Sequence, residues 1–521
     1  METTTTAAEM AKPKPAIDAD DRLSSLPDEV ITHILSFLQT KYAVGTAVLS
    51  RRWKDLWTRV SNLDLDNGLI DQPMPGNVAF QSLPLDEQEK YLDGSLPALE
   101  VLRSRLLEFS RFVDRVLSQH RNLDSLRRFR FNCSIGIRER ELRPGFWFRR
   151  KWVFGPLLEE IDMVIEGDTA GVHFPLGIHH LPQNLYTLKN LRVLKLEGVS
   201  LDSAKTSIFL PSAKILQLRE VTFWNFETLS SLFSGCPALE TAILEGGTFV
   251  HGEQDILMVS LPSLKKLKMI RFGKNYACPV VIEARNLEEL ELQEFADVKF
   301  VGSSTLSCLL SANIDIGRSD SWADVLHGVL NQIRNAKKMF ITGKTMDLLR
   351  VSNRFLRLPL PIFQKLTHLT IGNGGHSRVF YSLLNSASKL QSLIINLESS
   401  IWDMEWEMLE HFSTPECLLS SLEEVEIKDF PRCEHHRIMI AYLLKVGAVL
   451  KKMDIHVKEY NFDIEDHKDL ASLLKLPRGS SHCEARVLLP NNEEISISSD
   501  NEACIDVQMD DDFDVGDNTD N

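Results

Sequence analysis

The sequence lacks the features that would place the chain outside the cell or in a membrane. Its eight cysteines occur singly, without a Cys-x-x-Cys pair, so a disulfide framework is not expected. The opening stretch METTTTAAEMAKPKP has no apolar signal-peptide core, and no apolar run approaches the length of a membrane-spanning helix. We therefore expect an intracellular protein of the cytoplasm, the nucleus or both, with reduced thiols and no membrane partner.

Motifs of catalysis and of ligand binding are also missing. HExxH, GxSxG and GxGxxG do not occur. Gly343–Thr345 resembles the end of a phosphate-binding loop, but Lys338 stands where that loop requires its first glycine. The cluster Cys433–His436, with Cys417 or His482–Cys483, has no zinc-motif spacing, so exposed histidines are the commoner explanation. We expect no catalytic residue, no cofactor and no metal.

Positive charge is absent from the C-terminal end. From Val487 to Asn521 there is no Lys or Arg, and 11 acidic residues carry most of the net charge of −15. The remaining chain is left with only −4, which argues against nucleic-acid binding. Composition predicts an acidic disordered tail at 487–521 and a small, polar, disordered arm at 1–19.

Residues 20–66 have the pattern of a short helical block. Pro27 suits the first position of a helix, and Asp28 and Glu29 favour the positive end of its dipole. Ser50 is a plausible N-cap for a further helical segment. The apolar residues recur at helical spacing: Val30, Ile31, Ile34, Leu35 and Leu38, then Trp53, Leu56 and Trp57. So small a block cannot bury them all, and its apolar face needs a cover.

Two covers are possible for this apolar face. Residues 67–95 are rich in Pro, Gly and Gln and are expected to form a loop. Apolar residues at steps of three and four then predict a helix at 97–119, which closes a linker-and-helix region at 67–120. The apolar face could pack against this helix or against another protein, and the residues by themselves leave both alternatives open.

From residue 121 onward the chain repeats the leucine-rich-repeat pattern L-x-x-L-x-L. Eleven units follow one another with first positions 22 to 32 residues apart. Each unit predicts a strand and a return segment, and stacked neighbours bury a continuous core. The first positions are Leu191, Ala213, Leu239, Leu264, Leu287, Ser311, Ala336, Leu366, Leu390, Leu422 and Leu450. Weaker copies begin at Leu126 and Leu158.

Residues between the inward apolar positions are expected on the concave surface of the repeats. Their mixed charge suits a protein target better than nucleic acid. The expected target-binding residues are Lys195, Gln217, Lys268, Glu291, Asp315, Phe340 and Thr370. The asparagine or cysteine usual eight residues after the first leucine is missing (Val199, Val221 and Phe430 stand there), so we expect an irregular arc with variable return segments.

The N-terminal block resembles an F-box. The resemblance rests on Leu23–Ile31 (LSSLPDEVI), Ile34–Leu38 (ILSFL) and Val48–Trp53 (VLSRRW). The segment from Pro415 to Ile455 is similar to the FBD that ends many plant F-box/leucine-rich-repeat proteins. It departs from the FBD at Val446–Ala448, where Asn–Ala is usual.

The resemblance implies an α/β protein, with a short all-α F-box at 20–66 and an irregular leucine-rich-repeat solenoid at 121–412. Parallel strands would line the concave face, and an FBD-like segment at 413–486 would continue the repeats. The chain would be the non-catalytic substrate-recognition subunit of an SCF-type cullin–RING ubiquitin ligase. The F-box would dock on a Skp-type adaptor, and through it on the cullin and RING subunits, while the repeats hold an unknown protein target.

The resemblance favours a foreign cover for the apolar face, although some of its residues must form the core of the block itself. The expected adaptor-binding residues are Leu26, Pro27, Ile34, Leu35, Leu38, Val48, Leu49, Trp53 and Leu56.

Two rival functions remain. The first is an interaction scaffold with leucine-rich repeats that never joins a ligase. The second is a co-receptor for an anionic small molecule, which would need clustered basic outward residues. Arg128 and Arg130 stand near Glu160 and Asp162 instead, so the sequence does not favour this second rival.

Overall fold

In the computed structural model, the described residues fall into two compact units. Unit 1 consists of Met1–Arg138 with Phe154–Met163, and unit 2 of Glu139–Val153 with Val164–Asn521. The structure describes residues 23, 25–68, 97–120, 123–134, 153–166, 181–201, 208–250, 257–271, 280–295, 298–299, 306–316, 322–351, 360–372, 375–397, 402–403, 413–431, 434–458, 470–490, 494–497 and 503–506.

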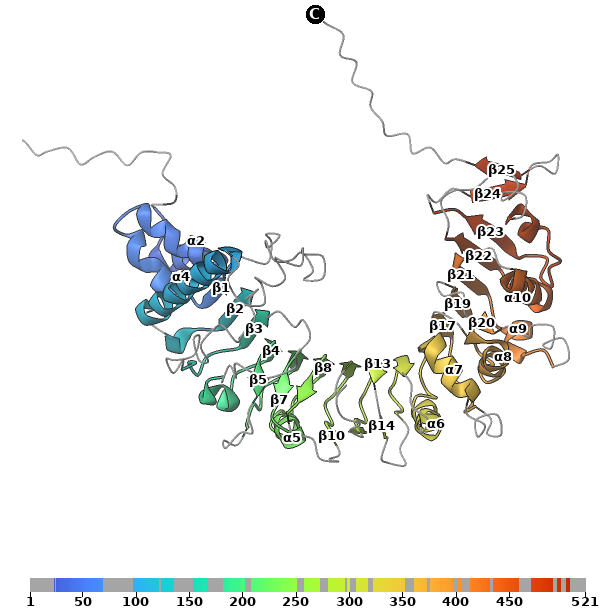
Figure 1. The fold of residues 1–521 in the computed structure, drawn as a ribbon, viewed down its shortest axis with the longest axis horizontal. Coiled ribbons are helices and arrows are strands. Elements are labelled where there is room, and N and C mark those ends of the chain that lie inside the picture. The colour runs from blue at the N-terminus through green and yellow to red at the C-terminus, as the bar shows by residue number, and fades with distance from the viewer. Residues whose placement is uncertain are drawn as a thin grey trace, which may run out of the picture. The chain divides into compact units, whose positions relative to one another are not determined.

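Unit 1 begins with short helices and continues as a parallel sheet (Figure 1). Its elements are α1 (Asp28–Leu35), α2 (Thr40–Gly45), η1 (Thr46–Val48), η2 (Trp53–Arg59), β1 (Asn62–Asp66), α4 (Pro97–Gln119), η4 (Leu123–Ser125), β2 (Arg128–Ser134) and the first part of β3 (Glu160–Glu166). The predicted helix at 97–119 is α4.

The N-terminal block is helical as predicted, except at its end. Residues 62–66 form strand β1, which pairs in parallel with β2 so that Leu63 aligns with Phe129 and Leu65 with Phe131. Val60, Leu63 and Leu65 have the spacing of the later repeats and are buried. The repeat pattern therefore begins inside the block, and the helical content of the preceding residues had hidden it.

Unit 2 is a stack of parallel strands whose connections vary (Figure 1). In order of pairing its strands are β4 (Val193–Glu197), β6 (Ile215–Arg219), β8 (Thr241–Glu245), β11 (Lys266–Ile270), β13 (Glu289–Phe295), β15 (Ser311–Ile316), β16 (Lys338–Thr342), β17 (His368–Gly372), β19 (Ser392–Asn396), β21 (Glu424–Phe430), β22 (Lys452–Val457) and β23 (Glu484–Leu488). The predicted repeat solenoid with parallel strands is confirmed.

Return segments in unit 2 are a mixture of short strands and helices, and helices are commoner in the later repeats. They comprise η6 (Gln183–Thr187), β5 (Ser200–Leu201), β7 (Thr222–Phe223), α5 (Phe226–Ser234), β9 (Thr248–Phe249), β10 (Leu257–Ser260), β12 (Val280–Glu283), β14 (Val298–Lys299), α6 (Trp322–Gln332), α7 (Gly343–Val351), β18 (Gly375–His376), α8 (Ser377–Asn385), β20 (Trp402–Asp403), α9 (Glu416–Ser420) and α10 (Glu434–Val446). The variable return segments expected from the missing asparagines are present.

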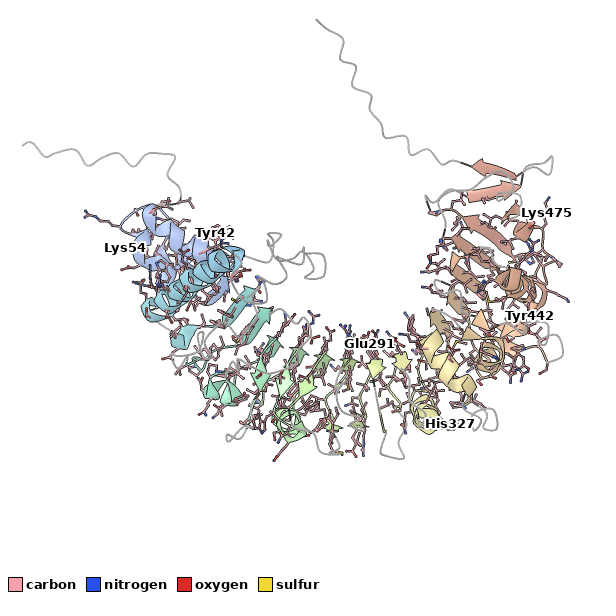
Figure 2. The ribbon with its side chains drawn as sticks, viewed as in Figure 1. Tyr42, Lys54, Glu291, His327, Tyr442 and Lys475 are labelled. Atoms are coloured by element: carbon pink, nitrogen blue, oxygen red, sulfur yellow. The ribbon has the colours of Figure 1, made fainter. Side chains whose placement is uncertain are left out.

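Each strand buries alternate side chains, because successive side chains of a strand point to opposite faces. In β11, Leu267 and Met269 are buried while Lys266 and Lys268 are partly exposed. Figure 2 shows Glu291 of β13 and His327 of α6 on opposite sides of the sheet. We call the side of Glu291, away from the return segments, the open face.

One repeat was placed two residues too far along the sequence. The pattern Ser311–Ile314–Ile316 predicted Asp315 as its middle outward residue. Ala312 pairs with Leu290 and Met339, and Ile314 pairs with Leu292 and Ile341, so the true middle residue is Asn313. The small Ala312 at an apolar position had favoured the wrong frame, and only pairing with neighbouring strands reveals the right one.

A left-handed turn closes the strand in many repeats. Positive φ occurs seven residues after the first apolar position, at Gly198, Glu220, Gly246, Arg271, Glu294 and Asp429. Glycine takes this conformation without steric cost, whereas the four others are strained. The buried Val199 and Val221 follow two of these turns, at the position where the regular repeat has asparagine.

The predicted tail boundary at 487 is wrong. β24 (Glu494–Ile497) pairs antiparallel with β23, and β25 (Ala503–Asp506) pairs antiparallel with β24. The alternation of Ile495 and Ile497 with polar residues suits a strand, and the edge of β23 needs backbone partners. The acidic composition had outweighed this local signal.

Candidate functional site

The F-box block has a small core made by one stripe of α1 and by η2. Ile31 and Leu35 of α1 are buried, as are Trp53, Leu56 and Trp57 of η2. These side chains recur every three or four residues and therefore share one side of each helical segment. The two tryptophans thus belong to the interior of the block.

A second stripe of the same block is exposed. Val30, Ile34 and Phe37 follow at i, i+4 and i+7, and the Phe37 side chain is 74% exposed. Val48, the last residue of η1, and Leu49 after it are 88% and 63% exposed. Leu38 and Tyr42 are also exposed. So many large apolar side chains exposed in so short a segment are typical of interaction surfaces.

An arginine joins the two ends of the block. The Arg52 guanidinium donates hydrogen bonds to the Asp28 carboxylate at 2.8 Å and to the carbonyl of Leu26. This exposed ion pair contributes about 1 kcal/mol or less to folding. Its consequence is geometric, because it holds the start of α1 beside the segment that follows Val48 and Leu49.

Helix α4 packs elsewhere in unit 1. The Phe109 ring centroid lies 5.9 Å from that of Phe131 in β2. At the C-terminal end of the helix, His120 Nε2 lies 3.0 Å from the carbonyl oxygen of Val60, just before β1. The described part of α4 therefore contacts the sheet, and Val48 remains exposed in its presence.

The nine residues predicted to bind an adaptor separate into two groups. Leu35, Trp53 and Leu56 are buried within the block, so they are corrected to core residues. The other six are at least partly exposed: Leu26, Pro27, Ile34, Leu38, Val48 and Leu49. Sequence reasoning missed Val30 as an exposed residue, and it missed Phe37 and Tyr42 altogether. The heptad spacing of Val30, Ile34 and Phe37 was a readable signal for a separate stripe.

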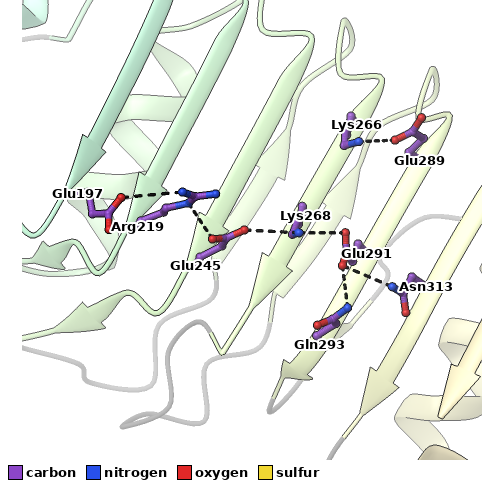
Figure 3. A network of polar contacts seen from close by, with 9 residues as sticks. All are labelled: Glu197, Arg219, Glu245, Lys266, Lys268, Glu289, Glu291, Gln293 and Asn313. Atoms are coloured by element: carbon purple, nitrogen blue, oxygen red, sulfur yellow. Dashed lines mark hydrogen bonds and ion pairs between the residues drawn. The ribbon is translucent and has the colours of Figure 1, made fainter. Parts of the chain in front are cut away.

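The open face of the central repeats carries a continuous chain of opposite charges (Figure 3). Arg219 of β6 lies 4.0 Å from Glu197 and 2.8 Å from Glu245. Lys268 of β11 lies 3.5 Å from both Glu245 and Glu291. The Glu291 carboxylate in turn accepts hydrogen bonds from Gln293 at 2.7 Å and from Asn313 at 3.4 Å.

The strands bring six of the seven predicted target-binding residues into one row. By register the row contains Lys195, Gln217, Lys268, Glu291, Phe340 and Thr370. Asp315 lies in the next row, where its carboxylate accepts a 2.7 Å hydrogen bond from Thr342. Lys268 and Glu291 already form ion pairs inside the chain, so the structure favours them less as contacts for a target.

The weaker motifs receive structural roles where they are described. Thr345 is buried, and its hydroxyl accepts a 2.9 Å hydrogen bond from the backbone of Ile316. His436 is buried, so the expectation of an exposed histidine is wrong for this residue, and Cys433 lies outside the described residues. Across the described ranges, no group of three or more His, Cys, Asp or Glu is placed to hold a metal ion. Within those ranges, no helix combines the length and apolar character needed to cross a membrane.

Buried cysteines are held in their thiol form. Burial raises the pKa of Cys236 and of Cys417 to about 12 and also raises that of Cys483. A high thiol pKa makes a poor nucleophile at neutral pH. Cys308 is exposed instead.

Comparison with known proteins identifies both ends of the chain. The family model of the F-box domain matches residues 23–65, and that of the FBD matches residues 412–455. The chain thus carries an F-box domain and an FBD, as predicted.

The similarity to curated proteins extends over most of the chain. A putative F-box/FBD/LRR-repeat protein of Arabidopsis thaliana is 28% identical over 90% of this chain and 99% of its own length. An FBD-associated F-box protein from the same plant is 28% identical over 89% of this chain and 98% of its own length. An F-box/LRR-repeat protein of Arabidopsis thaliana is 26% identical over 91% of this chain and 100% of its own length. The predicted resemblance to plant F-box proteins with repeats and an FBD is confirmed.

The F-box domain gives a general function. F-box proteins are generally substrate adaptors of SCF complexes, and the F-box domain generally binds a Skp-type adaptor. F-box proteins with leucine-rich repeats are typically non-catalytic.

Proposed function

We propose that this chain is the substrate-recognition subunit of an SCF-type cullin–RING ubiquitin ligase. The F-box block docks on a Skp-type adaptor, and the repeats hold a protein target for ubiquitination. One observation carries the proposal: the segment that matches the F-box domain exposes a set of large apolar side chains beside its own complete core. The chemistry of ubiquitin transfer belongs to other subunits, and this chain contributes proximity.

The docking surface consists of residues, at least partly exposed, from α1, α2, η1 and the turns beside them. It comprises Leu26, Pro27, Val30, Ile34, Phe37, Leu38, Tyr42, Val48 and Leu49. Apolar anchors at the centre of an interface typically cost about 2 kcal/mol or more when truncated. Phe37, Val48 and Leu49 are the most exposed large members and make the strongest candidates for such anchors.

Two double variants of the full-length chain test the proposal in a pull-down with a purified Skp-type adaptor. Val48→Asp with Leu49→Asp should abolish binding, because carboxylates would be buried without partners. Leu26→Ala with Pro27→Ala should weaken it. Ile362→Asp is the control, since Ile362 is 66% exposed but lies in unit 2. Undiminished adaptor binding by both folded double variants would refute the docking surface.

Participation in a ligase needs its own measurement. A tagged full-length chain should co-purify a cullin subunit from plant cells, and Val48→Asp with Leu49→Asp should lose it. A scaffold outside any ligase predicts no cullin with either protein. Circular dichroism of the double variant checks that its fold is retained.

A further inference from the structure

Positive charge is concentrated in one group of repeats. Residues 326–397 contain ten Lys or Arg and a single acidic residue, Asp347, in a chain whose net charge is −15. This stretch includes strands β16, β17 and β19.

In the central repeats, lysines at the N-terminal ends of the strands form ion pairs with glutamates. We call this side of the sheet, where the strands begin, its edge. Glu240 accepts hydrogen bonds from Lys214 at 2.8 Å and from Lys265 at 2.9 Å, and these contacts lower its pKa to about 2. Lys266 lies 2.6 Å from Glu289 on the next strand. Farther along, Lys451 pairs with Glu423 at 2.8 Å.

The same edge of β16, β17 and β19 carries lysines without such partners, and a histidine lies among them. We call this stretch the basic edge; it consists of Lys337, Lys338, Lys365, His368 and Lys389. All five are exposed, and none has an ion pair within the described residues. The register aligns Lys338 with His368 across neighbouring strands, and His368 in turn with Ser392. Nearby like charges raise the free energy of the surface, and an anionic partner would relieve it.

An apolar strip lies next to the basic edge on the open face. Phe340 aligns with Thr370, and Thr370 with Ile394, two positions farther along the same strands. The Phe340 ring extends over Gly372, where an added Cβ would come within 2.9 Å of ring atom Cζ. Because Gly372 has no side chain, the ring can lie against the sheet, and both Phe340 and Ile394 remain partly exposed.

We propose that the basic edge and its apolar strip bind an acidic peptide segment of the target, with at least one large apolar side chain seated against Phe340 and Ile394. The inference rests on the proposed function and names the chemistry of its target. Carboxylates of the segment would pair with Lys337 and Lys338, while its apolar side chain covers the strip.

A peptide fits this surface better than a nucleic acid does. The basic patch is short, and it is bounded on the next strand by Glu424, which is exposed. A phosphate backbone would meet that carboxylate and would leave the apolar strip uncovered. An acidic peptide can end or turn there and use both surfaces.

The test measures peptide binding to the full-length chain by fluorescence polarisation. The probe is a fluorescein-labelled nonapeptide of Asp and Glu with a central Leu, and its matched control has Asn and Gln in place of the acids. The acidic probe should bind about tenfold more tightly at low salt, a difference that shrinks as salt is added. Equal affinity of the two probes would overturn the proposal.

Charge reversal at matched positions assigns the site. Lys337→Glu with Lys338→Glu should weaken binding about tenfold or more, because two attractive contacts become repulsive. Lys265→Glu with Lys266→Glu alters the equivalent positions of β11 and should change affinity less than about twofold. An equal loss in both double variants would overturn the assignment to β16–β19.

The apolar strip is tested with charge held constant. Phe340→Ala should weaken the acidic probe about fivefold and should not affect a probe whose central Leu is replaced by Ala. Tripolyphosphate or a single-stranded oligonucleotide that binds the basic edge more tightly than the peptide would overturn the proposal. Skp-type adaptor binding should be unchanged in Lys337→Glu with Lys338→Glu, so that failure of the target surface and failure of the ligase assignment give different results.

Discussion

The F-box block and the repeat sheet use their apolar residues differently. In the repeats, every second side chain of a strand is buried, as Leu267 and Met269 are in β11. Charged residues occupy the open face between them. In the block, α1 buries Ile31 and Leu35 but leaves Val30 and Ile34 exposed on the adjacent stripe. A repeat buries its apolar residues against the next repeat, whereas the block has apolar residues left over after its core is complete. The exposed apolar residues of the block are therefore the better guide to a binding surface.

The largest expected effect is a difference in stability between variants at two neighbouring residues of α1. Leu35→Ala should destabilise unit 1 by about 3 kcal/mol, because Leu35 is 2% exposed and its removal leaves a cavity. Ile34→Ala should change stability by less than about 1 kcal/mol but weaken adaptor binding at least about tenfold. Thermal unfolding and adaptor titration of both variants measure this contrast, and equal destabilisation by the two would contradict the two-stripe description.

A glycine pair sharpens the description of the repeats. Gly198→Ala should destabilise unit 2 by about 2 kcal/mol, because φ is +66° and the new Cβ would lie 1.9 Å from the Ile165 carbonyl oxygen. Gly328→Ala in α6 meets no atom within 4 Å and should stabilise the helix by about 0.5–1 kcal/mol. Thermal unfolding compares the two, and a harmless Gly198→Ala would refute a required left-handed turn.

Loss of a charge from the central open face should have a smaller effect. Lys268→Ala leaves Glu245 and Glu291 without their shared cation and should cost about 1 kcal/mol at low salt. The cost should fall as salt screens the two carboxylates. Lys338→Ala, which removes an exposed cation without an ion pair in the described chain, is the control and should be neutral or slightly stabilising. Chemical denaturation at two salt concentrations measures the stability of both variants. An equal loss of stability in Lys338→Ala would contradict a stabilising role of the Lys268 ion pairs.

The smallest expected effect is a pH dependence of unit 1. Burial lowers the pKa of His120, and the hydrogen bond to Val60 only partly opposes this effect. The folded state therefore prefers the neutral imidazole, so its stability is retained above the unfolded pKa of about 6.5 and declines as pH falls below it. The thermal unfolding midpoint at pH 7.5 and 5.5 measures the decline. His120→Gln should reduce that pH dependence, and an unchanged slope would assign it to other groups.

Several features of the fold could be predicted because their signals are local or periodic. Helix α4 follows from apolar residues at steps of three and four, and the repeats follow from their period. The F-box and FBD follow from motifs such as LSSLPDEVI. Strand β1 could also have been found, since Val60, Leu63 and Leu65 already have the repeat spacing.

Other features depend on contacts that the sequence does not specify locally. The frame at Ala312 needed pairing with Leu290, and strands β24 and β25 needed the free edge of β23. The basic edge escaped notice because Lys338 and His368 are 30 residues apart in sequence but adjacent in register. The candidate docking surface was predicted in part, since helical spacing finds both stripes of α1 without saying which one is buried.

The sequence by itself determined the repeat period, the helices and the identity of the terminal domains, because side-chain periodicity and short motifs are set by residues close together in the chain. Tertiary structure decided which α1 stripe forms the core and which open-face charges neutralise one another. Those outcomes depend on the pairing of different elements, such as α1 with η2, or of residues from different strands, such as Lys268 with Glu291, and pairing is fixed only when the elements pack.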